Sequence, residues 1–314
     1  MIKVENLSKF YGDVKAVKSI NFELNDGEIV GFLGANGAGK STTLKVMTGF
    51  LTPTSGNVYV NDLEIQEHTL EIQKHIGYLP ELNPLYSEMR VYDLLEFTGT
   101  IRNITGKAFK NSLARVVEQC GLKEVIHRMI SECSKGYKQR IGLACAMIHD
   151  PKILILDEPV TGLDPNQIVE IRNLIKDLGR EKLVLMSSHI LQEIQATVNR
   201  IIIINKGEIV ADGTNEELMS GFIGNTKLTL EIKNAEDKTI KTLTEKIPSI
   251  SLVDTKSHNG SQILQLEYAK DFDPREELFK YAVDSNWVVT EMSPHSVNLE
   301  SIFRTLTMED KANA

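Results

Sequence analysis

A complete phosphate-binding loop pattern constrains the fold of this chain more than any other feature. Residues 34–42 read Gly-Ala-Asn-Gly-Ala-Gly-Lys-Ser-Thr, which matches G-x-x-x-x-G-K-[ST]. Residues 28–33 have the pattern of a buried strand and residues 41–47 that of a helix, as such a loop requires. The positive N-terminal end of that helix would face the bound anion. A glycine-rich turn without a ligand is the alternative, but the order of strand, loop and helix predicts a nucleoside triphosphate site.

The residues of this loop have separable roles. Glycines such as Gly37 and Gly39 permit backbone conformations that a Cβ would penalise, so consecutive N–H groups can turn inward around a phosphate. We expect Lys40 to reach the β- and γ-phosphates and the Ser41 hydroxyl to hold Mg²⁺. The predicted nucleotide-binding residues of the loop are Asn36, Gly37, Ala38, Gly39, Lys40, Ser41 and Thr42.

Two adjacent carboxylates, Asp157 and Glu158, follow the apolar run at 153–156. Alone, this pattern also fits a strand that ends in a solvated acidic turn. Together with the phosphate loop, it predicts that Asp157 binds Mg²⁺ directly or through water and that Glu158 polarises the attacking water. Successive side chains at the end of a strand diverge, so the two carboxylates can serve the metal and the water separately.

The hydrophobic pattern predicts an α/β fold in two domains, since 314 residues exceed the usual length of one domain. The first 35 residues alternate like an antiparallel β region. Apolar runs at 152–156 and 183–186, separated by a helical stretch, indicate a parallel sheet with crossover helices. The later order β-α-β-β-α-β fits a small α+β, ferredoxin-like unit. We therefore expect domains at 1–214 and 215–314.

Charge, cysteine spacing and the length of the apolar runs argue against several classes of function and location. The formal net charge of −8 argues against wrapping nucleic acid, which basic surfaces favour. The three cysteines show no C-x-x-C spacing, so we expect neither a disulfide framework nor a zinc site. The chain opens with strand-like alternation instead of a leader, and its longest apolar runs are too short to cross a bilayer. These features predict a cytoplasmic location unless another protein holds the chain at a membrane.

Three further motifs complete a recognisable set: Ser134-Lys135-Gly136 before a helical stretch, Thr161-Gly162-Leu163-Asp164, and Ser187-Ser188-His189. With the loop and the carboxylate pair, they resemble the ATP-binding subunits of ABC transporters over about residues 1–215. The resemblance implies a P-loop NTPase core of ABC type, with a helical subdomain at about 88–150, that binds and hydrolyses ATP with Mg²⁺. It also implies that the later domain is an accessory one.

The same resemblance assigns roles to single residues. It places Tyr11 on the adenine ring, and Ser134 and Gly136 on the γ-phosphate bound by a second subunit. Asp164 belongs to the D-loop, and His189 is the switch histidine. The plainer alternatives are a packing aromatic for Tyr11, a helix cap for Ser134 and a structural histidine.

The motifs also depart from the family pattern. Cys133, Lys135 and Tyr137 replace the leucine, the first glycine and the glutamine of the signature motif. Glu81 stands where the family usually has glutamine, a residue implied to contact Mg²⁺ and the attacking water and to pass motion to the membrane subunit. A carboxylate there adds negative charge but is a stronger metal ligand. Alternatively, Glu81 points into solvent.

A subgroup and a set of partners follow from the resemblance. Residues 76–86 and 162–167 look close to the gliding-motility-associated ABC ATPases of Bacteroidetes and to multidrug and ion exporter subunits, and 298–303 resembles the end of exporter accessory domains. With one loop and one signature per chain, the resemblance implies a homodimer around two ATP molecules, coupled to separately encoded permease subunits on the cytoplasmic face of the cell membrane. The alternatives are a non-transport ABC ATPase acting on nucleic acid or ribosomes, and a regulatory module that never hydrolyses ATP.

Overall fold

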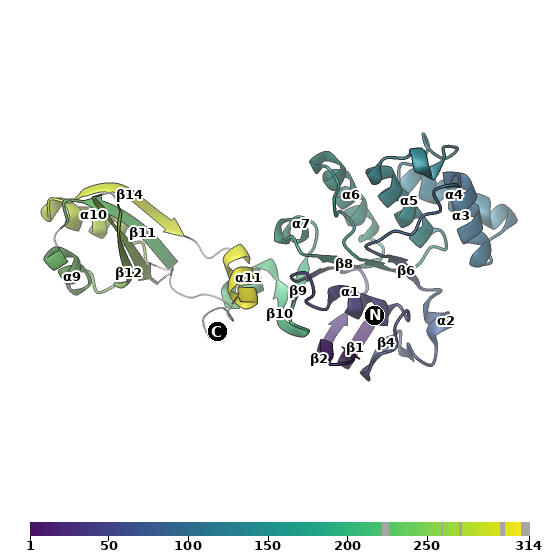
Figure 1. Ribbon diagram of the computed structural model, residues 1–314, viewed down its shortest axis with the longest axis horizontal. Helices are drawn as coiled ribbons and strands as arrows, with labels where there is room; N and C mark the ends of the chain where they lie inside the picture. The colour runs from purple at the N-terminus through teal and green to yellow at the C-terminus, as the bar shows by residue number, and fades with distance from the viewer. Residues whose placement is uncertain (222–225, 236, 259, 270–271, 296–298, 309–314) are drawn as a thin grey trace. The chain divides into compact units, whose positions relative to one another are not determined.

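The computed structural model of the chain describes residues 1–221, 226–235, 237–258, 260–269, 272–295 and 299–308. The chain divides into two compact units, which are described separately (Figure 1). The first comprises Met1–Asn215 and Leu306–Ala314, and the second comprises Glu216–Thr305. The division into a nucleotide-binding domain at 1–214 and an accessory domain at 215–314 stays a prediction.

A six-stranded sheet with the order β10-β9-β3-β8-β7-β6 forms the centre of the first unit. Its neighbouring strands pair in parallel, except that β10 pairs antiparallel with β9. The inner strands are apolar and buried throughout, as expected where both faces of a sheet are covered. The strands are β3 (Ile29–Leu33), β6 (Ile76–Leu79), β7 (Ile153–Leu156), β8 (Leu183–Ser188), β9 (Arg200–Asn205) and β10 (Glu208–Thr214).

A second, antiparallel sheet with the order β2-β1-β4-β5 confirms the predicted N-terminal β region. Its strands are β1 (Ile2–Tyr11), β2 (Val14–Leu24), β4 (Ser55–Val60) and β5 (Leu63–Glu64). Helix α1 (Lys40–Met47) lies between the two sheets (Figure 1). Its Leu44 and Met47 share one buried core with Phe22 of β2 and Phe32 of β3. This packing fixes the start of α1 at the end of β3, where the phosphate loop lies.

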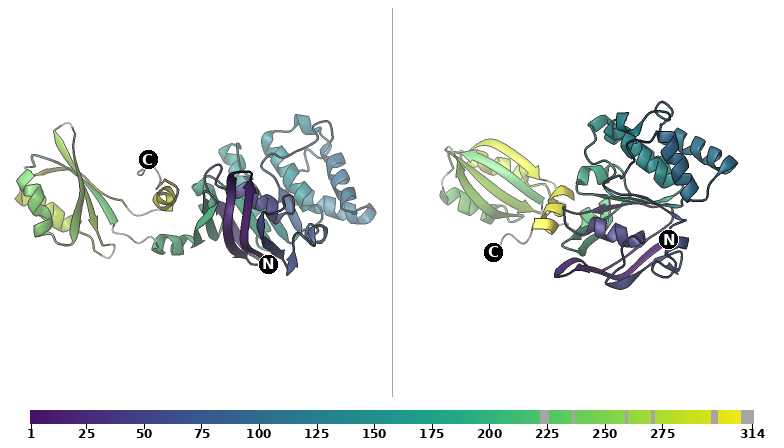
Figure 2. Two further views of the ribbon diagram at one scale, coloured as in Figure 1. Left: turned by 60° about the horizontal axis from the view of Figure 1, so that its bottom comes forward. Right: turned by 45° about the vertical axis from the view of Figure 1, so that its right-hand side comes forward.

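The remaining helices of the first unit cover the other side of the parallel sheet or stand apart from it (Figures 1 and 2). They are α2 (Thr69–Ile72), α3 (Val91–Ile101), α4 (Gly106–Gln119), the 3₁₀ helix η1 (Ile130–Glu132), α5 (Lys135–Met147), α6 (Pro165–Leu178) and α7 (Leu191–Gln195). Helix α8 (Asn215–Gly221) begins at the last residue before the second unit, to which its other residues belong. The sequence has a helical pattern from about 90 to 122, with a second helical stretch predicted at about 107–120, and the structure forms α3 and α4 in this region. The chain turns between them, with Asn103 and Gly106 at positive φ.

The second unit contains a four-stranded antiparallel sheet with the order β12-β13-β11-β14, and helices α9 and α10 cover one face of it (Figure 2). The chain order β-α-β-β-α-β with this strand order is that of a ferredoxin-like fold, which confirms the predicted α+β unit. Trp287 is buried in its core. The elements are β11 (Thr226–Lys233), α9 (Asp237–Lys246), β12 (Ile250–His258), β13 (Ser261–Tyr268), α10 (Arg275–Asp284) and β14 (Val288–His295).

The last element is α11 (Leu299–Met308). It contains most of the segment 298–303 that resembles exporter accessory domains, although Asn298 lies outside the described residues. Among the residues that the structure describes, no helix has the length and apolar character needed to cross a membrane.

Candidate active site

The phosphate loop connects β3 to α1 and encloses one side of a cavity of about 370 Å³. Gly37 and Gly39 have φ values of 79° and 110°, and Gly39 is the N-cap of α1. A residue with a Cβ would be strained in these conformations, so the two glycines allow the backbone to curve around the cavity. The lining residues are Ala16, Asn36, Gly37, Gly39, Lys40, Ser41, Thr42, Glu81 and Glu158.

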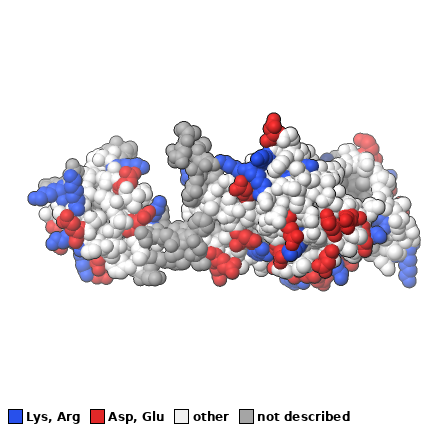
Figure 3. Space-filling model, turned by 90° about the horizontal axis from the view of Figure 1, so that it is seen from below, with Lys and Arg blue, Asp and Glu red and all other residues white. Residues whose placement is uncertain are grey.

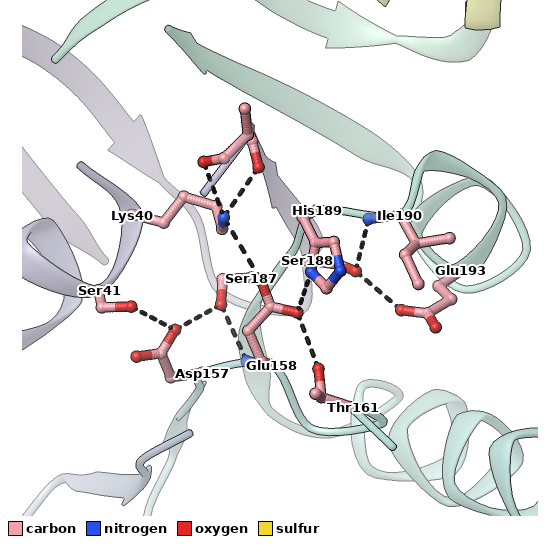
Figure 4. A network of polar contacts seen from close by, with 12 residues as sticks. Lys40, Ser41, Asp157, Glu158, Thr161, Ser187, Ser188, His189, Ile190 and Glu193 are labelled. Atoms are coloured by element: carbon pink, nitrogen blue, oxygen red, sulfur yellow. Dashed lines mark hydrogen bonds and ion pairs between the residues drawn. The ribbon is translucent and has the colours of Figure 1, made fainter. Parts of the chain in front are cut away.

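Lys40 is buried at the centre of the loop and has oxygen partners on opposite sides (Figure 4). Its Nζ donates to the carbonyl oxygens of Gly34, at 2.8 Å, and Ala35, at 3.3 Å. The same Nζ lies 3.4 Å from Oε1 of Glu158. A buried ammonium group needs such partners to offset its lost hydration. The lysine therefore connects the loop to the carboxylate that follows β7.

Asp157 is buried at the end of β7 and is oriented by two hydroxyl groups. Its Oδ1 accepts hydrogen bonds from Ser187 Oγ at 2.6 Å and from Ser41 Oγ at 3.2 Å. The Ser41 hydroxyl and the Asp157 carboxylate thus lie side by side, although they come from segments 116 positions apart. Oxygen atoms in this arrangement are the ligands that Mg²⁺ prefers.

Glu158 points in a different direction from Asp157 because its backbone has a φ of 50°. A positive φ is uncommon for a residue with a side chain and occurs where the surrounding structure enforces it. Here the Glu158 N–H donates to Ser187 Oγ at 2.9 Å. The same serine therefore holds both carboxylate residues, one through its side chain and the other through its backbone.

Three segments converge on the Glu158 carboxylate (Figure 4). Besides the contact of Oε1 with Lys40, Oε2 accepts a hydrogen bond from Thr161 Oγ1 at 3.0 Å. Oε2 also lies 2.9 Å from Nδ1 of His189, in the turn between β8 and α7. A carboxylate held in this way beside the phosphate loop can orient or deprotonate a water molecule.

The residues predicted to bind nucleotide from other motifs do not line this cavity. Tyr11 is 47% exposed at the end of β1, and the Lys9 ammonium lies 5.4 Å from the centre of its ring. Ser134 is the N-cap of α5, and its Oγ accepts from the Tyr137 N–H at 3.3 Å. Asp164 caps α6 in the same way, through the Gln167 N–H at 3.0 Å.

Two of these motifs are close to each other. A Cβ on Gly136 would lie 2.6 Å from the end of the Gln167 side chain, so the start of α5 closely approaches the start of α6. Ser134 and Gly136 of the signature motif and Asp164 of the D-loop therefore lie at two neighbouring helix starts and do not line the phosphate-loop cavity. Glu81, in contrast, is exposed and lines the phosphate-loop cavity with Lys40 and Ser41.

Sequence reasoning gave no role to Thr161 and Ser187, both of which contact the carboxylate pair. Each lies inside a recognised motif, but neither motif states which hydroxyl reaches Asp157 or Glu158. Only the fold brings the end of β8 beside the end of β7.

Comparison with known proteins shows the family to which this chain belongs. The family model described as ABC transporter matches residues 17–161. The ABC transporter ATP-binding protein YxlF of Bacillus subtilis (strain 168), itself uncharacterized, is 34% identical over 304 residues, which cover 96% of this chain and 98% of YxlF. This chain belongs to the ABC transporter ATP-binding proteins. It is an ABC transporter ATPase.

Two further comparisons extend this result. The linearmycin resistance ATP-binding protein LnrL of Bacillus subtilis (strain 168) is 36% identical over 238 residues, 76% of each chain. The dimeric structure of MJ0796, a bacterial ABC transporter cassette, has a TM-score of 0.62 at 26% identity and covers 68% of this chain and 98% of that cassette. ABC cassettes form dimers and pair with permease subunits. The ABC transporter ATPase described here has the fold of such a cassette in its first unit.

Proposed function

We propose that this ABC transporter ATPase works as a homodimer that hydrolyses Mg²⁺-ATP to drive separately encoded permease subunits of an exporter. The observation that carries the proposal is the convergence of Lys40, Thr161 and His189 on Glu158 beside the phosphate loop. This geometry supplies a cationic group for phosphates and a positioned carboxylate for water in one cavity.

The donor atoms of the site fit Mg²⁺. Ser41 Oγ and Asp157 Oδ1 are 3.2 Å apart, and Glu81 adds a second carboxylate at the cavity wall. Mg²⁺ is usually held by one or two carboxylates and substrate phosphates and keeps several waters, so these groups suffice. When bound there, Mg²⁺ would neutralise charge on the phosphates. We therefore assign Ser41, Asp157 and Glu81 to the metal.

Glu158 and His189 act on the other side of the phosphates. Glu158 accepts the proton of the attacking water or orients it, and His189, 2.9 Å away, keeps this carboxylate in place and faces the γ-phosphate. The loop N–H groups, Lys40 and Thr42 bind the phosphate chain, and Tyr11 covers the adenine. Glu81, at the cavity wall, assists in holding the water and the metal.

A second copy of the chain would complete each site. Ser134, Gly136 and Asp164 lie at the starts of α5 and α6 and do not line the cavity of their own chain. Helix N-termini carry free N–H groups and partial positive charge, which favour a phosphate. An isologous dimer would bring the signature residues of one copy to the γ-phosphate in the other and enclose two ATP molecules.

A groove beside the site is suited to a permease segment. It has a volume of about 450 Å³ and lies between the core and the helical subdomain, in contact with the segment that leads to Glu81. Several of its apolar residues are exposed, including Phe50 at 71% and Tyr86 at 58%. A short helix of a permease subunit could bury this surface and move with Glu81, which would link ATP hydrolysis to transport.

We infer that the direction of transport is export, because the relative LnrL is a linearmycin resistance protein. Such a pair of subunits would operate at the cytoplasmic face of the cell membrane. The resemblance to gliding-motility ATPases stays a prediction. Nucleic-acid binding is disfavoured because acidic and basic side chains are interspersed over the face of the first unit in Figure 3, without a continuous basic stripe on that face.

Two substitutions test this function. Glu158→Gln should keep ATP affinity within about threefold and lower ATP turnover at least about 100-fold, because the carboxylate acts on the water and not on the nucleotide. The same variant with ATP should elute as a stable dimer in light-scattering measurements. Lys40→Ala should instead weaken nucleotide binding. Wild-type turnover by Glu158→Gln, or unchanged affinity in Lys40→Ala, would contradict the proposal.

A further inference from the structure

The turn that holds His189 is fixed from both sides by the hydroxyl of Ser188 (Figure 4). Strand β8 ends at Ser188 and α7 begins at Leu191, so only two residues connect them. Ser188 Oγ accepts a hydrogen bond from the Ile190 N–H at 3.0 Å and donates one to Glu193 Oε2 at 2.8 Å. The hydroxyl therefore ties the end of the strand to the next turn of the chain across His189.

Glu193 is a buried carboxylate, with 8% of the residue exposed, on the inner side of α7. Burial raises the pKa of its carboxyl above the usual value, and the Ser188 hydroxyl, His189 and Arg172 of α6 oppose this shift. The negative charge of Glu158 adds to the raised pKa of Glu193. Burying a carboxylate costs free energy that an apolar residue would not cost. We attribute the carboxylate at this buried position to a role in the neighbouring turn, which carries His189.

The contacts of Ser188 and Glu193 affect where the side chain of His189 lies. Its Nδ1 lies 2.9 Å from Glu158 Oε2, while its side chain is 36% exposed. A misplacement of about 1 Å in a catalytic arrangement can cost on the order of 100-fold in rate. Ser188 and Glu193 are both buried and neither lines the phosphate-loop cavity, so they act on the site through the histidine.

We propose that Ser188 and Glu193 are positioning residues that hold His189 against Glu158. This inference rests on the proposed ATP hydrolysis, in which His189 faces the γ-phosphate. Neither residue touches the reacting atoms. Their hydrogen bond sets the backbone of residues 188–190, and the imidazole ring follows that backbone.

Steady-state kinetics provide the first test. Glu193→Ala and Ser188→Ala should each lower kcat about tenfold or more and leave the KM for ATP within about twofold, because the loop that binds ATP is untouched. Glu193→Gln and Ser188→Thr retain a hydrogen-bonding pair and should keep most of the activity. Gln192→Ala changes an exposed neighbour on the same helix and serves as the matched control. An unchanged kcat in Glu193→Ala, or an equal loss in Glu193→Gln, would overturn the proposal.

The second test observes the His189 ring directly by NMR and does not depend on ATP hydrolysis. In ¹H–¹³C spectra of the histidine-labelled full chain, the ring signal that disappears in His189→Gln identifies His189. Glu193→Ala should shift or broaden this signal and leave the other six histidines unchanged. Glu193→Gln should restore it. An unmoved His189 signal would refute the positioning role even if the wild-type chain proved unable to hydrolyse ATP, an outcome that would refute only the proposed function.

Discussion

Glu81 is the residue at which the proposed metal site departs from the family pattern. The structure places it at the wall of the phosphate-loop cavity with Ser41 and Glu158, on the segment that follows β6. A glutamine there could offer one neutral oxygen, whereas the glutamate offers a charged carboxylate. Carboxylates bind hard cations more strongly than amides, so this position should tune the requirement for Mg²⁺.

We expect Glu81→Gln to raise the Mg²⁺ concentration needed for half-maximal ATP hydrolysis by about threefold or more. The KM for ATP at saturating Mg²⁺ should stay within about twofold, because the phosphate loop and Lys40 are unchanged. Titration of Mg²⁺ against phosphate release measures both quantities. Glu88→Gln removes an exposed carboxylate from the same connecting segment and is the control. The same Mg²⁺ requirement in Glu81→Gln and wild type would remove Glu81 from the metal site.

Local spacing in the sequence was enough to select candidate residues that the structure brings together, although their roles stay predictions. Lys40 and Ser41 follow from one nine-residue pattern, and Asp157 and Glu158 follow from an apolar run that ends in two acids. Ser187 could not be assigned in this way, because its bond to Asp157 spans 30 positions and depends on β7 and β8 being neighbours.

Glu193 lay outside every recognised motif. An acidic residue on a short helix carries no signal in the sequence that it will be buried against a serine hydroxyl. Its 8% exposure is known only once α7 is packed on the sheet.

At the scale of elements, continuous apolar runs predicted strands well. The run at 152–156 became β7 (Ile153–Leu156), because a strand covered on both faces needs apolar residues at every position. Within the helical pattern at 90–122, the sequence predicted a second helical stretch at about 107–120, which corresponds to α4 (Gly106–Gln119), but not the break that separates it from α3. That break depends on Asn103, whose φ is 59°, and on the Ile104 N–H bond to the Gly99 carbonyl, neither of which changes the hydrophobic period.

His149 links the end of the α5 segment to β6 and makes this junction sensitive to acid. Its Nε2 lies 3.1 Å from the Ile76 carbonyl oxygen. Burial lowers the pKa of His149 from 6.5 to about 4, with the positive charges of Arg102 and Arg115 contributing further. The folded chain therefore favours the neutral ring. As the pH falls from about 6.5 to about 4, the unfolded chain binds a proton that the folded chain does not, and stability is lost.

We expect His149→Gln to reduce this acid sensitivity. The amide can still donate to the Ile76 carbonyl, but it does not titrate in this range. Between pH 7 and pH 5, the melting temperature of the wild-type chain should fall more than that of the variant, by an amount corresponding to about 1–2 kcal/mol. Thermal unfolding in matched buffers measures the difference. Equal losses in the two proteins would show that His149 does not titrate differently in the folded and unfolded chains.

For the whole molecule, the second unit contains none of the recognised motifs. Its core of Leu230, Leu264, Trp287 and their neighbours is separate from that of the first unit. Among the residues that the structure describes, no cluster of three or more histidine, cysteine or acidic side chains could hold a metal. These features favour the prediction that residues 215–314 are an accessory domain.

A chain truncated after Asn215 tests this prediction. The phosphate loop, Asp157, Glu158 and His189 all belong to the part that remains, so ATP affinity should stay within about twofold of the full chain. The truncation removes Leu306, whose carbonyl accepts from Asn205 Nδ2 at 2.9 Å, which should cost about 1 kcal/mol and lower the melting temperature slightly.

ATP-dependent dimerisation of the Glu158→Gln variant should weaken in the truncated background if the accessory domain supports assembly. Isothermal titration and light scattering measure the two properties. A truncated chain that is folded by circular dichroism yet fails to bind ATP would show that residues 216–314 contribute to the nucleotide site.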